Sequence, residues 1–273
     1  MIWDLEKENQ SLKDVLDQVQ EGDLILLADQ TYVEKVAVKT KNITMIGKPN
    51  TKICFHASHG TLVPKEEGGD GKKVYGTTGS ATFTVCKEAS GFKAFQITFQ
   101  NDFVRNGRKN GQAVAFKSET SDVLLQNCRF LGYQDTLYMD GGIRNHIENC
   151  YIEGDIDFIF GSADCLFDSC FIVAKTNEAK ELYFTAPNTL KTNSSGFVFQ
   201  NCVFETTEQT VYLGRPWYPS NAVDQTYPKI AFYNCRLKKT ILPYLKKMHE
   251  QNPTEYSFRL ENCTFVGGTD EEK

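Results

Sequence analysis

The chain has 273 residues, a formal net charge of −5 and a pI near 5.5. This length suits one large domain or two small ones, and the acidic balance argues against nucleic-acid binding, which usually requires a basic face. No run of 18 apolar residues occurs, so we expect no membrane-spanning helix and no membrane partner.

The first residues and the cysteines bear on the cellular compartment. Residues 1–6 (MIWDLE) lack the basic start and the apolar stretch of a signal peptide. We therefore expect a cytoplasmic protein, the alternative being a secreted protein whose leader has been removed. The nine cysteines cannot all pair, and their regular placement predicts buried free thiols rather than a disulfide framework.

The first predicted element is a short amphipathic helix. Ser11 is a suitable N-cap residue, and apolar residues follow at positions i, i+3, i+4 and i+7 (Leu12, Val15, Leu16 and Val19). A strand is predicted directly afterwards, at residues 24–27. A single helix ahead of repeated strands is typical of a cap that covers the open first coil of a solenoid.

Two weak strand repeats follow, at residues 36–46 and 92–101, and they enclose a glycine-rich polar stretch at 60–79. This stretch lacks the lysine-serine ending of a phosphate-binding loop. We expect it to form a long surface loop.

A short motif then recurs six times: an apolar residue, any residue, Asn or Ser, Cys, any residue and an apolar residue. These units are rich in Phe, Val, Ile and Cys, which favours strands over helices. We predict an all-β chain folded as a parallel β-helix and forming a single domain over residues 1–273. The residue before each cysteine would turn the chain and bond its equivalent one coil away, and the cysteine would fill the interior. The repeated cysteines are Cys128, Cys150, Cys170, Cys202, Cys235 and Cys263.

The segment between the last two copies of this motif differs in its pattern. Residues 238–252 carry Leu242, Leu245 and Met248 at helical spacing. We expect a short helix there, on the side or at the end of the solenoid.

Two pairs of polar residues are each separated by 22 residues, about the length of one coil: Gln112 with Gln134, and Asp135 with Asp157. Equivalent positions of successive coils lie about 4.8 Å apart, so the two pairs are expected on one patch of surface. Neighbouring carboxylates do not titrate independently, and one should hold a proton while the other is ionised. Taken singly, each aspartate could instead bond backbone amides at a coil corner.

A cation would keep one of these carboxylates ionised. Arg215 is the candidate, because Pro216 restricts the local backbone and the arginine lies in a later coil. By contrast, the histidines do not complete a hydrolytic triad or a zinc site: no Gly-x-Ser-x-Gly turn occurs, and no further ligands accompany His56 and His59. We expect no metal and no cofactor.

Four segments resemble signatures of the pectin methylesterases (pectinesterases), which are carbohydrate esterases with a right-handed parallel β-helix fold. The order and spacing agree, although Phe116 replaces a leucine and Gln30 replaces a glycine of an early family signature. The resemblance extends over about residues 22–237. The matching segments are QAVAF at 112–116, QDTL at 134–137, DFIFG at 157–161 and LGRPW at 213–217.

The resemblance implies a role for each matched residue. Asp157 would be the nucleophile that attacks the methyl ester of a galacturonate unit, Asp135 the acid and then the base, and Arg215 the residue that orients Asp157. Gln112 and Gln134 would stabilise the oxyanion. Tyr138, Phe160 and Trp217 would line the groove for a methyl-esterified polygalacturonate or oligogalacturonide. We expect the protein to be a monomer.

The residues alone leave the bond that is cleaved open. Two close carboxylates also suit a retaining glycosidase, and pectin-cleaving enzymes share the β-helix. A non-catalytic β-helix that only binds polysaccharide is a third possibility. The paired glutamines and Arg215 favour the esterase.

Overall fold

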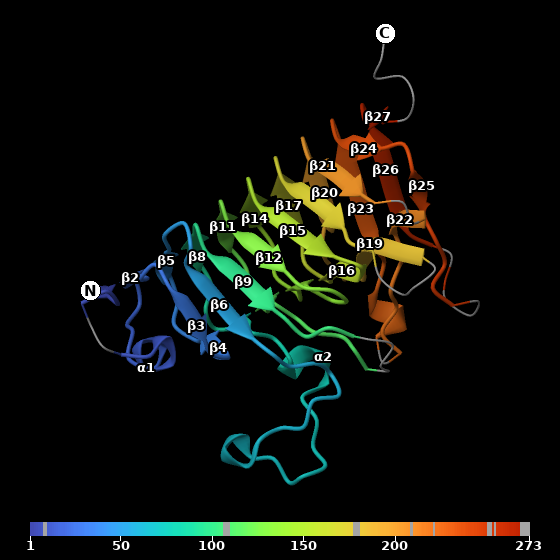
Figure 1. Ribbon diagram of the computed structural model, residues 1–273. Coiled ribbons are helices and arrows are strands. Elements are labelled where there is room, and N and C mark those ends of the chain that lie inside the picture. Colours follow the sequence, from blue (N-terminus) through green and yellow to red (C-terminus); the bar gives the residue numbers. More distant parts are fainter. Residues whose placement is uncertain are drawn as a thin grey trace.

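The computed structural model describes residues 1–7, 10–105, 110–176, 181–207, 210–220, 222–249, 253 and 255–267. The chain winds into a stack of coils, and successive coils add strands to three long sheets (Figure 1). Neighbouring strands within each sheet pair in parallel. The predicted parallel β-helix is therefore present.

The strands of the three sheets are short and follow one another in the order sheet A, sheet B, sheet C in most coils. Sheet A contains β1 (Ile2–Asp4), β2 (Leu24–Leu26), β5 (Thr44–Ile46), β8 (Lys93–Phe95), β11 (Leu124–Gln126), β14 (Asn145–Glu148), β17 (Cys165–Asp168), β20 (Phe197–Gln200), β23 (Lys229–Tyr233) and β26 (Ser257–Glu261). Sheet B contains β3 (Thr31–Val33), β6 (Lys52–Phe55), β9 (Thr98–Asn101), β12 (Arg129–Leu131), β15 (Tyr151–Gly154), β18 (Phe171–Ala174), β21 (Val203–Thr206), β24 (Arg236–Lys238) and β27 (Thr264–Val266). Sheet C contains β4 (Val36–Val38), β7 (Phe83–Val85), β10 (Phe116–Ser118), β13 (Leu137–Met139), β16 (Ile156–Gly161), β19 (Glu181–Pro187), β22 (Thr210–Gly214) and β25 (Ile241–Leu245).

The interior is a column of aromatic and aliphatic side chains. Phe167, Phe199 and Phe232 occupy equivalent positions of β17, β20 and β23, and their rings stack at centroid distances of 4.5 and 5.1 Å. All three are fully buried, and the burial of each such side chain contributes about 1.5–3 kcal/mol to the stability of the fold. Although these residues are 32 and 33 positions apart, the strands stay in register, and described segments outside the sheets, such as residues 188–196 between β19 and β20, take up part of the difference.

The residue before each repeated cysteine turns the chain, as predicted. Its φ lies between 51° and 56° in all six copies, a left-handed conformation that asparagine tolerates better than most residues. The Asn149 Nδ2 donates to Asn127 Oδ1 at 2.5 Å, which confirms for this pair the expected bond between neighbouring coils. The six turn residues are Asn127, Asn149, Ser169, Asn201, Asn234 and Asn262.

The cysteines form a ladder of thiols within the stack. Five of the six repeated cysteines are buried and Cys263 is half-buried. The Cys128 backbone N–H donates to Cys150 Sγ at 3.3 Å, so consecutive coils contact each other directly through this ladder. All nine cysteines are unpaired, as predicted.

This ladder predicts that a reducing agent leaves the melting temperature unchanged. A structural disulfide would contribute about 2–4 kcal/mol to the free energy of unfolding. In a chain of this size, each kcal/mol shifts the melting temperature by about 2–4 °C. Calorimetry with and without reductant, together with thiol titration of the denatured, non-reduced protein, measures this directly. A melting temperature lowered by several degrees in reductant would contradict free thiols.

Helix α1 (Leu12–Leu16) covers the N-terminal end of the stack, as predicted (Figure 1). Ser11 Oγ accepts from the Asp14 N–H at 3.0 Å and caps the helix. The Glu34 carboxylate accepts from the N–H groups of Leu12 and Lys13 at 3.1 and 2.9 Å. Because a helix N-terminus favours negative charge, Glu34 fixes the cap to the first coil.

Two predictions outside the regular coils had different outcomes. Residues 60–79 form a loop that projects from the stack and carries the 3₁₀ helix η1 (Lys65–Glu67) and helix α2 (Gly76–Gly79), as expected (Figure 1). The helix predicted over 238–252 is wrong for the residues that the structure describes, because residues 241–245 form strand β25, which pairs with β22. Residues 250–252 lie outside the described residues. Pairing at the sheet edge outweighs the helical spacing, and an edge strand tolerates Pro243 because its nitrogen need not donate.

A second 3₁₀ helix, η2 (Val223–Gln225), lies between β22 and β23. The described part of the chain has only short helices, and none of them could span a bilayer.

Candidate active site

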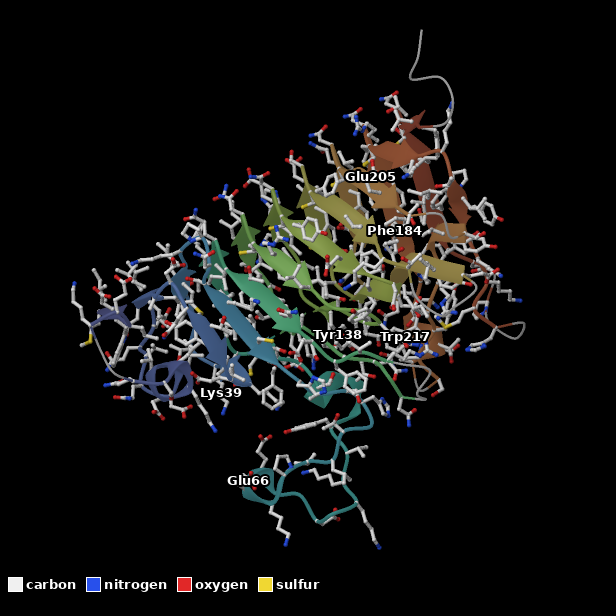
Figure 2. All side chains as sticks on the ribbon, viewed as in Figure 1. Lys39, Glu66, Tyr138, Phe184, Glu205 and Trp217 are labelled. Atoms are coloured by element: carbon white, nitrogen blue, oxygen red, sulfur yellow. The ribbon has the colours of Figure 1, made fainter. Side chains whose placement is uncertain are left out.

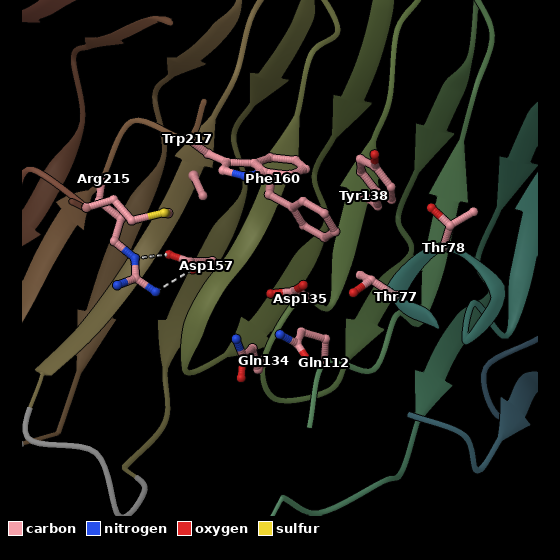
Figure 3. A pocket seen from close by; sticks show the side chains of 12 residues that line it. Thr77, Thr78, Gln112, Gln134, Asp135, Tyr138, Asp157, Phe160, Arg215 and Trp217 are labelled. Atoms are coloured by element: carbon pink, nitrogen blue, oxygen red, sulfur yellow. Dashed lines mark hydrogen bonds and ion pairs between the residues drawn. The ribbon is translucent and has the colours of Figure 1, made fainter. Parts of the chain in front are cut away.

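All eight residues predicted for the site line one cleft of about 340 Å³ on the outer face of sheet C. They come from the segments that precede or form β10, β13 and β16 and from the segment after β22 (Figure 3). Figure 2 places Tyr138 and Trp217 on the same flank of the stack. The cleft is lined by Thr77, Thr78, Gln112, Gln134, Asp135, Tyr138, Asp157, Phe160, Ala186, Arg215, Trp217 and Met248.

Asp135 and Asp157 occupy equivalent positions of consecutive coils. Leu137 pairs with Ile159, two residues beyond each aspartate, so the expected one-coil offset is present. Both aspartates are more than 90% buried and have left-handed backbone conformations, with φ of 68° and 53°. Such φ values cost about 1–3 kcal/mol for residues other than glycine and often accompany functional sites.

The two carboxylates differ in their partners. Arg215 Nε and Nη2 donate to Asp157 Oδ1 and Oδ2 at 2.8 and 2.7 Å, a bidentate ion pair (Figure 3). This geometry fixes the orientation of the Asp157 carboxylate as well as its charge. A cation from a later coil therefore contacts one carboxylate of the pair directly.

The pKa values of the two carboxyl groups differ because Arg215 contacts only one of them. Burial raises the pKa of Asp135 well above its usual range, the nearby charge of Asp157 raises it further, and Arg215 acts in the opposite direction. Burial also raises the pKa of Asp157, but there the hydrogen bonds and charge of Arg215 counteract it directly. Asp135 therefore holds a proton more strongly, and Asp157 is the carboxylate that ionises first.

The carboxamides of Gln112 and Gln134 lie beside the aspartates. Their side-chain nitrogens point toward Asp135 in Figure 3. The Gln112 Oε1 is buried and has no hydrogen-bond partner among the described residues, and Gln112 lines the cleft. Gln112 and Gln134 are 22 residues apart, whereas the strands that follow them pair with an offset of one residue less, as Phe116 with Leu137. Both glutamine side chains nevertheless line the same cleft.

An aromatic cluster forms the wall of the cleft beside these polar groups. The rings of Tyr138 and Phe160 stack at 4.1 Å, and Phe160 lies 6.1 Å from Trp217 at a tilted angle. Tyr138 and Phe160 are buried, whereas Trp217 is half-buried and offers more of its ring to the cleft. Flat apolar faces of this kind suit the apolar faces of sugar rings.

Sequence reasoning missed four residues that line the cleft: Thr77, Thr78, Ala186 and Met248. Thr77 and Thr78 lie in α2, at the end of the loop that was predicted only to cover the surface. Met248 follows β25, in the segment for which a helix was predicted. No local pattern marks these residues, because segments from distant coils bring them to the cleft.

The histidines and acidic residues supply no metal centre in the part of the chain described. His56 Nδ1 lies 2.8 Å from Asp102 Oδ1, and both side chains are exposed. The described residues contain no group of three or more His, Cys, Asp or Glu side chains arranged to hold a metal ion. The charged groups that line the cleft are the carboxyl groups of Asp135 and Asp157 and the guanidinium of Arg215.

Comparison with known proteins identifies the family to which this geometry belongs. A family model described as Pectinesterase matches residues 4–245. The chain belongs to the pectinesterase family. It is 34% identical over 225 residues to Pectinesterase 31 of Arabidopsis thaliana, an alignment that covers 80% of this chain and 68% of that protein.

Other relatives are longer than this chain. Probable pectinesterase/pectinesterase inhibitor 64 of Arabidopsis thaliana is 31% identical over 241 residues, which cover 81% of this chain and 36% of that protein. The alignment thus spans about a third of that relative's length. The cytoplasmic location expected from residues 1–6 finds no support in these relatives.

The fold is also found in solved structures. A crystal structure of an aspartate-to-alanine mutant of pectin methylesterase, in complex with a hexasaccharide, superposes with a TM-score of 0.79 at 24% identity and covers 96% of this chain and 87% of that one. The predictions of the pectinesterase family, a carboxylic ester hydrolase and a right-handed parallel β-helix are confirmed.

Proposed function

We propose that residues 1–273 act as a single domain that hydrolyses methyl esters of galacturonate units in pectin or oligogalacturonides and releases methanol, without a cofactor. The carrying observation is the asymmetry of the aspartate pair, in which Arg215 binds Asp157 with two hydrogen bonds while Asp135 is the carboxyl with the more strongly raised pKa. One ionised and one protonated carboxyl group in the same cleft supply a nucleophile and an acid.

In the first half of the reaction, an Asp157 carboxylate oxygen attacks the ester carbonyl carbon, and the carbonyl electron pair moves to the oxygen. The side-chain N–H groups of Gln112 and Gln134 stabilise this oxyanion, because donors already aimed at the cleft require little reorganisation. As the oxyanion collapses, the bond to the methoxy group breaks and Asp135 donates its proton. Methanol leaves, and the galacturonate acyl group remains bound to Asp157 as an anhydride.

The second half regenerates the enzyme. Asp135, now ionised, accepts a proton from water as the water oxygen attacks the acyl carbon of the galacturonate. The anhydride bond breaks, and Asp157 leaves as a carboxylate that Arg215 again binds. Asp135 has regained its proton, so the cycle closes without a further reactant.

The substrate class rests on the cleft and its neighbours. Tyr138, Phe160 and Trp217 provide an aromatic wall next to the aspartates. The hexasaccharide bound by a structurally similar pectin methylesterase supports a chain of several sugars as substrate here. We propose a methyl-esterified polygalacturonate or oligogalacturonide bound by a monomer.

One experiment distinguishes this function from its alternatives. The purified protein is incubated with methylated pectin and with methylated oligogalacturonides, and methanol and new reducing ends are measured in parallel. We expect methanol without reducing ends. Reducing ends without methanol would instead identify a glycosidase, and binding without either product would identify a non-catalytic polysaccharide-binding protein.

Arg215→Ala is expected to lower methanol release about 100-fold and to move the acid limb of the pH profile of kcat/KM to higher pH. Asp157 must be ionised to attack, and its pKa rises further when the guanidinium is removed. Arg144→Ala is the matched control, because Arg144 makes a similar bidentate pair with exposed Asp122. An acid limb that stays in place in Arg215→Ala would contradict the role of Arg215.

A further inference from the structure

The side chain of Arg215 crosses a strand to reach its partner. Arg215 follows β22 and Asp157 lies in β16, and β19 lies between these two strands in sheet C. The Arg215 backbone N–H donates to Thr185 O at 2.9 Å, which anchors the start of this path on β19. The guanidinium then lies over the ring of Tyr183, also in β19, with its carbon 4.2 Å from the ring centroid.

The guanidinium is thus held on two sides. Asp157 binds its edge through two hydrogen bonds, and Tyr183 supports its face. A cation over an aromatic ring is attracted by the ring electrons, and the attraction is stronger where water is excluded. The side chain of Arg215 is only 23% exposed, so this contact is largely shielded.

The ring of Tyr183 is itself fixed by its neighbours on the outer face of sheet C. Ile156, Tyr183 and Tyr212 occupy paired positions of β16, β19 and β22, and Leu242 of β25 continues the column. The rings of Tyr183 and Tyr212 stack at 5.4 Å with an angle of 15° between their planes. Tyr183 is 6% exposed, so the column holds its ring plane in place.

The hydroxyl of Tyr183 is held by an ion pair outside the cleft. It donates to Glu181 Oε2 at 2.7 Å, and Tyr212 donates to the other oxygen at 3.3 Å. Lys246 Nζ donates to both Glu181 oxygens at 2.6 Å. Burial raises the pKa of Tyr183 to about 12, so the hydroxyl remains a donor at neutral pH.

We propose that Tyr183 is a positioning residue that holds the guanidinium of Arg215 in the plane from which both N–H groups reach Asp157. The column of Ile156 and the stacked Tyr212 fixes the plane of the Tyr183 ring, and the Glu181–Lys246 pair binds its hydroxyl. This inference rests on the proposed function, in which Asp157 must be ionised and correctly oriented to attack.

The consequence for pH follows from the groups that face Asp157. Arg215, from the segment after β22, favours the ionised form of Asp157. Asp135, from the segment before β13, disfavours the ionised form of Asp157 when Asp135 is itself charged, and Tyr183 of β19 stays neutral. Asp155, which directly precedes β16, acts on Asp135. Without the Tyr183 ring the guanidinium can swing toward solvent, and the ionised form of Asp157 loses its main support.

The test compares three variants in the full-length protein. Tyr183→Leu is expected to lower kcat about tenfold and to move the acid limb of kcat/KM upward by about one pH unit, since one pKa unit corresponds to a tenfold change. Tyr183→Phe keeps the ring and should keep the acid limb of the wild type. Tyr151→Leu is the matched control, because Arg129 lies over the Tyr151 ring at 4.4 Å and the Tyr151 hydroxyl donates to Glu153, yet Tyr151 lies in β15 of sheet B and does not line the cleft.

A second measurement gives a readout besides activity. Carboxyl ¹³C NMR titration, with the Asp157 signal assigned by its loss in Asp157→Asn, should show a higher pKa for Asp157 in Tyr183→Leu and an unchanged pKa in Tyr183→Phe and Tyr151→Leu. If Tyr183→Leu does not fold, Tyr183→Met takes its place, because its unbranched, flexible side chain fills irregular space more easily.

The outcomes separate the inference from the function on which it rests. An acid limb and a ¹³C titration in Tyr183→Leu that match the wild type would overturn the positioning role, even if kcat falls. Equal shifts in Tyr183→Leu and Tyr151→Leu would also overturn it, because a general loosening of the stack would then explain both. A wild-type protein that releases no methanol would overturn the proposed function, while the titration would still decide whether Tyr183 positions Arg215.

Discussion

Asp157→Ala and Asp157→Asn are expected to reduce methanol release by at least about 10⁴-fold, because removal of a nucleophile leaves no group that can form the acyl intermediate. Both variants should fold, since the carboxylate lies in the cleft and its main contact is with Arg215. The measurement is kcat on methylated pectin, with circular dichroism and the melting temperature recorded for each variant.

The chain offers a closely matched control for this substitution. Asp122 also has a left-handed backbone, with φ of 62°, and also forms a bidentate pair with an arginine, Arg144. This pair is exposed and does not line the cleft. Asp122→Asn should therefore retain wild-type activity, and an Asp157→Ala protein that kept more than a small fraction of the activity would show that the nucleophile lies elsewhere.

Asp135→Asn is expected to lower methanol release by about 10²–10⁴-fold, the range typical for loss of a general acid and base. An asparagine cannot protonate the departing methoxide or activate the water that cleaves the anhydride. Because both halves of the reaction depend on Asp135, the loss should appear in kcat more than in KM. A variant impaired only in KM would point to a binding role for Asp135.

The same variant should be more stable than the wild type, and the difference should grow with pH. The folded-state pKa of Asp135 is raised, so its carboxyl group favours the fold when protonated, and this stability is lost as pH rises through the folded-state pKa. The uncharged asparagine avoids this loss. Melting temperatures measured from about pH 4 to about pH 9 test the sign, and a variant less stable than the wild type at high pH would contradict the raised pKa.

Much of the fold follows from local repetition along the chain. The Asn-Cys motif predicted the coils, because each copy places a residue that tolerates a left-handed turn next to a small side chain that fits the interior. Contacts in a solenoid join one coil to the next, so a spacing of 22 residues becomes a spatial neighbourhood. For the same reason the spacing alone predicts that Asp135 and Asp157 occupy neighbouring coils, as they do.

The tertiary structure decided what local repetition does not encode. The segment at 241–245 has helical spacing in isolation, but an unpaired edge of sheet C offered it strand hydrogen bonds, and Met248 thereby reached the cleft. Likewise, Tyr183 meets Arg215 only because the arginine side chain extends across β19 to β16. These contacts depend on how loops of different lengths leave and rejoin the stack. The free energy that stabilises them comes from packing between segments far apart in the sequence, and the residue pattern within a single segment does not encode it.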